Sequence, residues 1–374
     1  MKILMQSRMN FFSLPGGDTV QLKKTKENLE KMGVEIDFNL DFDVDLSGYD
    51  IVHLSNVTRI QETYLQMKNA KKQNKPVVLS TIFWPMDEFE KMGQKGIRKI
   101  IGSLLDIDNE ERLKAAARYI KDKESRNEAT KNLWKIGYRE MQKYVIDNAD
   151  FFLPNSEMEM DEFSKYFNVP KEKYIVVPNG IDKNIALVQM ENPVPEKFKK
   201  FEGYVICVGR IETRKNQLSL LKALEGTGLK VLLVGKPSSN QPGYFKEVKN
   251  LIDKNLNYKH IESIDNKDLY ALYKVCRVSA LPSWLDTPGL VSLEAGVMGC
   301  NLAVSIKGST REYYADYAEY CEPDDLDSIR NAVINAYNKE KNSGLRDRIL
   351  NLYTWENAAK ETLRCYEQVL CSMC

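Results

Sequence analysis

The sequence is poor in histidine and has no excess of charge of either sign. Its 374 residues include 2 His, 54 Lys and Arg, and 53 Asp and Glu, which gives a formal net charge of +1. Proteins that bind nucleic acid usually carry a basic excess. The near-neutral balance therefore argues against a nucleic-acid partner. His53 and His260 are the only histidines in the sequence.

Cysteine pairs and long apolar runs are also lacking. The 7 cysteines are an odd number without a CxxC pair, so we expect reduced thiols and no disulfide framework. Cys371 and Cys374 would suit lipidation or metal binding, but reduced thiols near a chain end are the simpler interpretation. No run reaches the ~20 apolar residues of a membrane-spanning helix, and "MKILMQSRMNFF" does not read as a signal peptide. We expect a cytoplasmic protein that is at most peripherally associated with a membrane.

Short apolar runs alternate with amphipathic stretches in two successive series. Runs of this kind, separated by helices, predict parallel sheets covered on both faces. A chain of 374 residues is also long for one hydrophobic core. We therefore predict an α/β protein with two Rossmann-like, doubly wound domains. The first series is "KILMQS", "YDIVHLS", "KPVVLSTIF", "ADFFLPNS" and "YIVVPNG", and the second is "YVICVGR", "KVLLVGK", "VSALPS" and "NLAVSI".

The predicted boundary between the domains lies near the Pro- and Lys-rich connector "PVPEKFKKFEG". We assign residues 1–190 to the first domain, 191–355 to the second, and 356–374 to a final helix. Residues 86–145 are predicted to be a helical insertion in the first domain, with a long helix through "LWKIGYREMQKYVI". The basic, amphipathic residues 91–105 either pack on their own domain or contact a membrane surface or a partner.

Two acids flank a predicted helix start in "LPSWLDTPGLVSLEAGVMGC". Pro288 and Gly289 suit the entry of a helix, where a proline loses no needed hydrogen bond. The first amides of such a helix, near Gly289, Leu290 and Val291, are unpaired donors that favour a phosphate.

The positions of the two acids relative to this helix suggest what each would bind. Glu294 lies about five residues into the helix, roughly 7 Å along its axis, where a carboxylate can accept both hydrogen bonds of a ribose diol. Asp286 precedes the helix and could meet a sugar beyond the diphosphate.

A diphosphate also requires fixed positive charges, and the stretch "VGRIETRKNQ" supplies them. Arg210 follows a predicted strand directly, and Lys215 comes five positions later. Both would lie at the carboxyl edge of a parallel sheet, where open α/β folds bind ligands. Each cation alone would be interpreted as a surface charge, but together with the acids they predict a site for a leaving nucleotide diphosphate.

The chain resembles the retaining glycosyltransferases of family four, which have the GT-B fold, with two domains facing each other across a cleft. The motifs are "VGRIETRKNQLSLLKAL" and "PSWLDTPGLVSLEAGVMGCNLAVS", together with "PGGDTVQLKKTKENLEKMGVEI", "NADFFLPNSEMEMDEF", "YIVVPNGID" and "TWENAAKETLRCYEQVL". The resemblance spans nearly the whole chain. It implies that the final helix crosses back to the first domain, which binds the acceptor, while the second domain binds the nucleotide sugar.

Roles for individual residues follow from this resemblance. Arg210 and Lys215 would bind the donor phosphates, Glu294 the ribose, and Asp286 the transferred sugar, which makes these four the predicted catalytic set. Glycines would allow close approach of the donor because they carry no side chain. The predicted donor-binding residues are Gly16, Gly17, Gly209, Gly235, Lys236, Pro288, Gly289, Leu290, Val291 and Glu294.

Two positions depart from the pattern of the family. Asp286 replaces the first Glu of the E-x7-E motif and is shorter by one methylene, so its contact with the sugar can shift. Phe83 stands where many relatives have a histidine, so no catalytic histidine is placed there. The role of Glu312, in "GSTREYY", stays open.

The acceptor is expected to meet loops of the first domain. His53 either touches substrate or is a packed histidine at a strand end. Trp84 either stacks on a sugar ring or packs inside the domain. The candidates are Ser7, Arg8, Asn10, His53, Ser55, Asn56, Thr81 and Trp84.

The expected activity is transfer of a sugar from a nucleotide-diphosphate sugar to a hydroxyl of a saccharide or lipid-linked acceptor, in bacterial polysaccharide, glycolipid or glycoconjugate synthesis. No metal is expected, although "DFDVD" and "DID" contain spaced acids. A nicotinamide dehydrogenase is disfavoured because "LPGGDT" lacks the GxGxxG turn. A sugar-nucleotide epimerase of GT-B fold and a non-catalytic subunit of a transferase complex remain alternatives.

Overall fold

The computed structural model describes residues 1–374 except 94–105, 122, 124, 342 and 373–374. The chain divides into two compact units. The first unit comprises Met1–Pro85, Ile100–Pro178 and Trp355–Cys374, and the second comprises Met86–Lys99 and Asn179–Thr354. The first unit is thus built from three separate stretches of sequence.

The first unit contains a parallel sheet whose five strands, among the described residues, follow the order β2-β1-β3-β4-β5. The register places Ile3 opposite Ile51 and Val52 opposite Val77. Strands β1, β3 and β4 are almost completely buried, as expected of strands covered on both faces. The strands are β1 (Lys2–Gln6), β2 (Glu35–Phe38), β3 (Ile51–Ser55), β4 (Val77–Ser80) and β5 (Phe151–Leu153).

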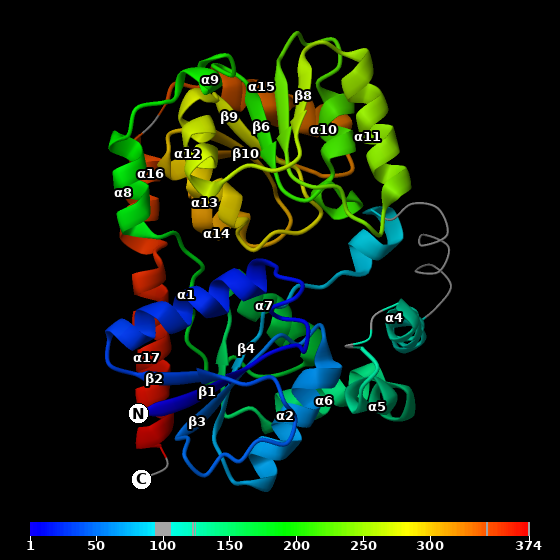
Figure 1. The fold of residues 1–374 in the computed structure, drawn as a ribbon, viewed down its shortest axis with the longest axis vertical. Helices are drawn as coiled ribbons and strands as arrows, with labels where there is room; N and C mark the ends of the chain where they lie inside the picture. Colours follow the sequence, from blue (N-terminus) through cyan, green and yellow to red (C-terminus); the bar gives the residue numbers. More distant parts are fainter. Residues whose placement is uncertain (94–105, 122, 124, 342, 373–374) are drawn as a thin grey trace. The chain divides into compact units, whose positions relative to one another are not determined.

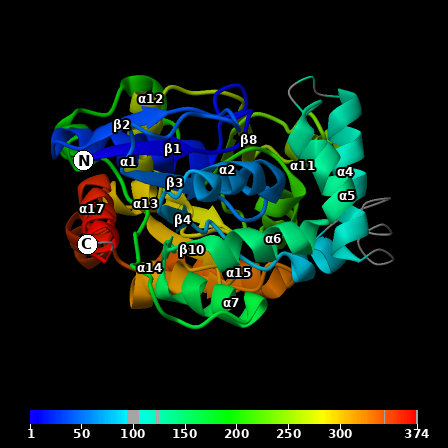
Figure 2. The same ribbon diagram turned by 90° about the horizontal axis from the view of Figure 1, so that it is seen from below.

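Helices cover both faces of this sheet. The strand order reverses at β1, so right-handed crossovers put α1 and α2 on opposite faces. Helix α17 packs beside α1, and α6 packs beside α2, as both views show (Figures 1 and 2). The helices are α1 (Gly17–Lys31), α2 (Ile60–Lys72), α4 (Ile107–Lys121), α5 (Glu128–Ile136), α6 (Tyr138–Asn148), α7 (Glu157–Phe167) and α17 (Trp355–Cys371).

The second unit contains a parallel sheet whose six strands, over the described residues, have the order β11-β10-β9-β6-β7-β8. Counted from β6, this is the 3-2-1-4-5-6 order of dinucleotide-binding folds, with the reversal between β6 and β9. The strands are β6 (Val205–Val208), β7 (Val231–Val234), β8 (Tyr258–Ile261), β9 (Val278–Leu281), β10 (Asn301–Ser305) and β11 (Ala318–Cys321).

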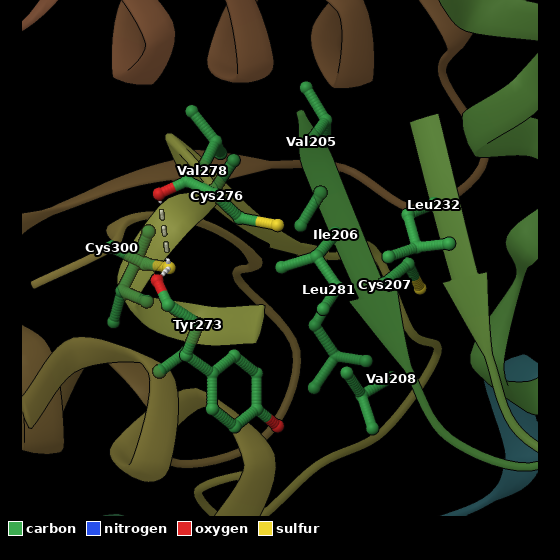
Figure 3. Packing of buried hydrophobic residues seen from close by; sticks show 14 of the residues in the cluster. Val205, Ile206, Cys207, Val208, Leu232, Tyr273, Cys276, Val278, Leu281 and Cys300 are labelled. Atoms are coloured by element: carbon green, nitrogen blue, oxygen red, sulfur yellow. Dashed lines mark hydrogen bonds between the residues drawn. The ribbon is translucent and has the colours of Figure 1, made fainter. Parts of the chain in front are cut away.

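The core of the second unit lies between this sheet and its helices (Figure 3). Ile206 and Leu232 are fully buried, and the Cys300 thiol donates to the Tyr273 carbonyl oxygen at 3.0 Å. The helical elements are η1 (Phe89–Gly93), α8 (Lys183–Glu191), α9 (Glu196–Lys199), η2 (Thr213–Lys215), α10 (Gln217–Ala223), α11 (Pro242–Lys254), α12 (Asn266–Val275), α13 (Leu290–Val297), α14 (Thr310–Tyr314), η3 (Ala315–Tyr317), α15 (Leu326–Asn338) and α16 (Ser343–Leu352).

The α/β class and the two parallel sheets predicted from the apolar runs are confirmed. The run "YIVVPNG" is not a regular strand: Tyr174 forms an isolated bridge with Phe152, and the Ile175 and Val177 amides donate to the Phe152 and Pro154 carbonyl oxygens without forming a longer ladder. The predicted long helix through "LWKIGYREMQKYVI" is two helices, because Gly137 adopts φ 101° between α5 and α6. The basic segment 91–105 lies mostly outside the described residues, so its membrane contact stays a prediction.

The sequence also leads us to expect no membrane-spanning helix and no disulfide framework. Within them, no helix is both long and apolar enough to cross a membrane. The cysteines that the structure describes are free thiols, and all but Cys371 are buried.

Candidate functional site

The loops that follow β6 and β9 carry the predicted phosphate and sugar ligands. These two strands are neighbours at the position where the strand order of the second sheet reverses. The helices on the two sides then lie on opposite faces, so their loops diverge and leave room for a ligand at the carboxyl edge. Residues 209–215 and 282–289 therefore meet at the expected binding position of this fold class.

Lys215 and Asp286 form a salt bridge across this position. The Lys215 ammonium donates to both carboxylate oxygens of Asp286, at 2.7 and 2.9 Å. The two side chains are only 13% and 12% exposed. Burial lowers the pKa of Lys215, and Asp286 counteracts part of that effect. Burial would raise the pKa of Asp286, but the charges of Lys215 and Arg214 outweigh it and leave that pKa lowered.

Neighbouring groups fix this ion pair in place. The Ser283 hydroxyl donates to the Asp286 carboxylate, and the Arg214 guanidinium donates to the Leu285 carbonyl oxygen at 2.7 Å. The Trp284 amide donates to the Arg214 carbonyl oxygen at 2.8 Å. The loop after β6 and the loop after β9 are therefore joined by both backbone and side-chain bonds.

Three glycines allow the backbone to pass close to itself around the pair. A Cβ at Gly235 would lie 2.2 Å from the Gly209 carbonyl oxygen, and both residues have strongly positive φ angles of 145° and 147°. A Cβ at Gly308 would lie 2.0 Å from the Asp286 carbonyl oxygen. A side chain at Gly235 or Gly308 would push these loops apart.

Helix α13 begins at Leu290, directly after Gly289 with φ 81°. Its first backbone bond is donated by Ser292 to the Gly289 carbonyl oxygen at 2.8 Å, so the amides of Leu290 and Val291 precede the hydrogen-bonded ladder. Pro288 stands before the cap rather than at the first helical position, and its peptide bond with Thr287 is cis. The predicted helix start is confirmed, and its phosphate-binding role stays a prediction.

Glu294 lies in the middle of α13 and is half-buried. Burial raises its pKa to about 7, and the nearby Tyr273 hydroxyl opposes that rise. A carboxylate with so high a pKa exchanges its proton near neutral pH, which a solvated surface acid does not do.

Arg210 and Lys236 differ from Lys215 in being exposed to solvent. Over the part of the chain that the structure describes, no ion pair involves either side chain. Both follow the glycines at which the two loops approach closely, since Arg210 comes after Gly209 and Lys236 after Gly235. These two cations are free to meet an anion, whereas Lys215 already has a carboxylate partner.

Most of the predicted acceptor-side residues of the first unit lie in or after β1 and β3, where its sheet also reverses, whereas Thr81 and Trp84 follow β4. The Ser55 hydroxyl donates to the Ser7 hydroxyl at 2.9 Å, and both are buried. Arg8 is 7% exposed and donates to Asp18 at 2.7 Å and to the Asn10 side-chain oxygen at 2.7 Å. These bonds give Arg8 a structural role in holding the loop.

His53 is 1% exposed, and both ring nitrogens have partners within the first unit. Nδ1 lies 2.6 Å from the Tyr366 hydroxyl and Nε2 lies 2.8 Å from the Ser80 hydroxyl. Burial lowers the pKa of His53 to about 4, so the ring is neutral at pH 7. Of the two interpretations offered by the sequence, the structure favours the packed histidine.

The remaining first-unit candidates take different positions. Thr81 is buried and donates to the Glu159 carboxylate. Asn56, with φ 78°, accepts from the Thr58 amide at 2.7 Å. Trp84 is half-buried.

The two glycines at the start of α1 serve different needs. Gly16 caps the helix and donates its amide to the Thr19 hydroxyl at 3.1 Å. A Cβ at Gly17 would have no described heavy atom within 4 Å, so the adjacent space is open.

Several residues of the site were missed in the sequence. Arg214 and Ser283 sit beside predicted residues but carry no motif of their own. Gly308 was visible only as part of "GSTREYY", and Glu159 looks in sequence like an ordinary helix-start acid. Among the described residues, no group of three or more His, Cys, Asp and Glu side chains is arranged to hold a metal ion.

Comparison with known proteins matches the second unit to a family. Residues 189–350 match the family described as "Glycosyl transferases group 1". The chain is similar to "O-antigen chain mannosyltransferase B" of Escherichia coli, with 23% identity over 239 residues, 59% of this chain and 61% of that protein. It is also similar to "D-inositol 3-phosphate glycosyltransferase" of Mycolicibacterium smegmatis, with 25% identity over 47% of this chain and 42% of that protein. The chain thus spans about half of the length of these curated relatives.

Solved structures share the fold over the whole chain. A sucrose-phosphate synthase from Thermosynechococcus elongatus has a TM-score of 0.71 at 15% identity and covers 100% of both chains. An Escherichia coli structure described as "Trehalose-6-phosphate from E. coli bound with UDP-2-fluoro glucose" has a TM-score of 0.66 at 12% identity and covers 99% of both chains. These findings confirm the resemblance noted in the sequence: residues 189–350 match the glycosyl transferases group 1 family, and the chain has the GT-B fold.

Proposed function

We propose that the protein transfers a sugar from a nucleotide-diphosphate sugar to an acceptor hydroxyl with retention of anomeric configuration. The observation that carries this proposal is the Lys215–Asp286 pair at the strand-order reversal of the second sheet, beside the start of α13. This arrangement offers a fixed cation, helix-start amides and a carboxylate within one set of joined loops.

Each group has a chemical task in this reaction. When the bond to the diphosphate breaks, negative charge grows on the leaving phosphate. Lys215, Arg210 and the amides of Leu290 and Val291 stabilise that charge from fixed positions. Because these groups are held before the reaction, they need little reorganisation in the transition state. Asp286 then both orients Lys215 and accepts a hydrogen bond from a hydroxyl of the donor sugar.

Glu294 binds the ribose diol of the nucleotide. Its carboxylate can accept two hydrogen bonds when ionised, and its raised pKa of about 7 makes this acceptance dependent on pH. The acceptor oxygen attacks the anomeric carbon from the side of the leaving group as the bond to the diphosphate breaks, and the hydroxyl proton passes to the leaving phosphate. This front-face route rests on analogy with the family.

The donor class is supported by relatives and neighbours. One neighbour is described as being in complex with UDP and glucose, with a TM-score of 0.58 at 15% identity. We propose a nucleotide-sugar donor, a saccharide or lipid-linked acceptor in bacterial polysaccharide, glycolipid or glycoconjugate synthesis, and no metal requirement. We also assign nucleotide-sugar binding to the second unit and acceptor binding to the first.

The test begins with a panel of nucleotide sugars screened for thermal stabilisation, because a bound donor raises the melting temperature by mass action. The donor found is then assayed with Lys215→Met and with Lys222→Met, an exposed lysine of α10. We expect about a 10²- to 10³-fold loss of kcat for Lys215→Met and none for Lys222→Met. An undiminished rate in Lys215→Met would refute the role of the pair.

Two further measurements address the alternatives and the metal. NMR of the donor incubated without acceptor would show isomerised nucleotide sugar if the protein were an epimerase. The absence of any donor binding by calorimetry would favour a non-catalytic subunit. Full activity in a chelator is expected, and loss of activity that added Mg²⁺ or Mn²⁺ restores would contradict the metal-free proposal.

A further inference from the structure

The segment Met86–Gly93 follows directly on Pro85 of the first unit but packs within the second unit. It is the cyan helical turn that ends at the grey trace in Figure 1. Its second half is the π-helical turn η1, which packs against η2, the turn that carries Lys215. The sequence predicts that these residues belong to the helical insertion of the first domain.

An aromatic contact joins this segment to the loop after β9. Phe89 and Trp284 are 6% and 8% exposed, and their ring centroids lie 6.2 Å apart. A Cβ at Gly93 would lie 2.9 Å from Trp284 Cδ2 and 2.3 Å from Phe89 Cδ2, so a side chain there would force the rings apart. Trp284 is bonded through its amide to the Arg214 carbonyl oxygen and stands two residues before Asp286.

A salt bridge joins the same segment to the other flank of Asp286. Glu88 pairs with the Lys307 ammonium at 2.8 Å. Lys307 precedes Gly308, which forms a backbone bridge with Asp286 and could not carry a Cβ without striking the Asp286 carbonyl oxygen. The Glu88 and Lys307 side chains are 48% and 26% exposed, so the pair adds little to stability but can fix the position of the turn.

We propose that Phe89 and Glu88 are positioning residues for the donor site. Phe89 supports the Trp284 side of the loop and Glu88 supports the Lys307 side, so that Asp286 is held against Lys215 from both flanks. The inference rests on the proposed function of the Lys215–Asp286 pair. Its physical basis is that a reacting group displaced by about 1 Å can lose up to about 10²-fold in rate without loss of the fold.

The alternative is that Phe89 only fills space in the second unit. Phe198 is a matched control, because it is also 6% exposed and belongs to the second unit. It lies in α9, which precedes β6, and so sits at the amino edge of the parallel sheet, opposite the carboxyl edge that carries Asp286. Loss of either phenylalanine should cost stability, but only loss of Phe89 should disturb the donor loops.

The experiment compares Phe89→Ala, Phe89→Leu, Glu88→Gln and Phe198→Ala in the full chain. Hydrogen exchange of residues 283–289 should rise in Phe89→Ala and stay at the wild-type level in Phe198→Ala. The kcat of Phe89→Ala should fall about 10- to 100-fold, with the Kd for the nucleoside diphosphate within about twofold of wild type. Phe89→Leu should recover most of the rate, and Glu88→Gln should lose no more than about fivefold.

The outcomes separate this inference from the proposed function. If hydrogen exchange at 283–289 and kcat are both unchanged in Phe89→Ala, or if both change to the same extent in Phe198→Ala, the positioning role is overturned. If the wild-type protein binds and turns over no nucleotide sugar, the proposed function fails, while the exchange data still decide whether Phe89 supports the loop. Should Phe89→Ala not fold, Phe89→Leu and Glu88→Gln carry the same comparison.

Discussion

The carboxyl edges of the two sheets have the same topology but opposite chemistry. In the first unit, the polar side chains at the strand-order reversal bond to one another, as Arg8 does with Asp18 and His53 with Tyr366. In the second unit, Arg210 stands exposed beside the buried pair of Lys215 and Asp286. A strand-order reversal therefore provides a place for a ligand. The charged side chains there that have no partner within the protein decide which ligand is bound.

The protonation of the two edges differs in the same way. Burial lowers the pKa of His53 to about 4 and leaves a neutral ring, whereas burial raises the pKa of Glu294 to about 7. At neutral pH the His53 ring is therefore neutral, whereas the Glu294 carboxyl is divided between its protonated and ionised forms. We expect mutations at the first edge to change stability and mutations at the second edge to change binding and rate.

The largest expected effect on stability is at Arg8. Arg8→Ala removes one partner of a buried pair whose side chains are 7% and 13% exposed, leaving Asp18 without its cation. The free energy of unfolding should fall by about 3–5 kcal/mol, measured by urea denaturation. Arg8→Lys keeps the charge but loses the forked geometry and should cost less. A loss below about 1 kcal/mol for Arg8→Ala would show that the first edge is not held together by this pair.

The next effect is the pH dependence caused by His53. Its folded pKa of about 4 lies below the ordinary histidine value of 6.5, so the unfolded chain takes up the proton first as the pH falls. Stability is therefore fully present above pH 6.5 and is lost toward pH 4, by about 3 kcal/mol from this group.

The measurement for His53 is the free energy of unfolding at several pH values for wild type and His53→Gln. The carboxylates titrate in both proteins, so the difference between the two curves isolates the histidine. Curves that run parallel between pH 6.5 and 4 would contradict the prediction.

Arg210→Ala should affect binding and leave stability unchanged. Its side chain is exposed, so the melting temperature should not move, whereas a lost charge-assisted bond to phosphate should weaken nucleoside diphosphate binding about 10- to 100-fold. Calorimetry measures the Kd, and Lys259→Ala, at an exposed lysine of β8, is the control. Unaltered binding in Arg210→Ala would remove this arginine from the donor site.

The smallest expected effect is the titration of Glu294. Its carboxylate accepts the ribose hydroxyls only when ionised, so donor affinity should rise by up to about tenfold from pH 6 to pH 8, through the pKa of about 7. The sign for stability is opposite, because an acid whose pKa rises from 4.5 in the unfolded chain to about 7 in the folded one loses stability as the pH rises from about 4.5 to about 7. Glu294→Gln should bind more weakly at pH 8 and show a flat pH profile. A flat profile in the wild type would separate Glu294 from the ribose.

Much of the fold and of the donor site could be predicted from the sequence. Central strands such as β6 and β9 are continuous apolar runs because both faces are covered, whereas the edge strands β2, β8 and β11 are only partly buried and were missed. "YIVVPNG" shows the converse error, since an apolar run can make a few backbone bonds at the edge of a sheet without forming a regular strand.

Contacts between distant loops could not be predicted. The sequence places Lys215 and Asp286 at the same sheet edge, but not in direct contact at 2.7 Å. The order of the chain likewise hides that Phe89 packs in the second unit, since its neighbours Pro85 and Ile107 belong to the first. Such pairings depend on how loops close, which local patterns do not encode.

The hydrogen bond between Tyr366 and His53 has a consequence for synthesis of the protein. In the order of the chain, β3 precedes the second unit and α17 follows it. The imidazole of His53 therefore has no Tyr366 partner until the second unit has been synthesised. The first unit therefore cannot complete its core until α17 has been made, which comes after synthesis of the second unit.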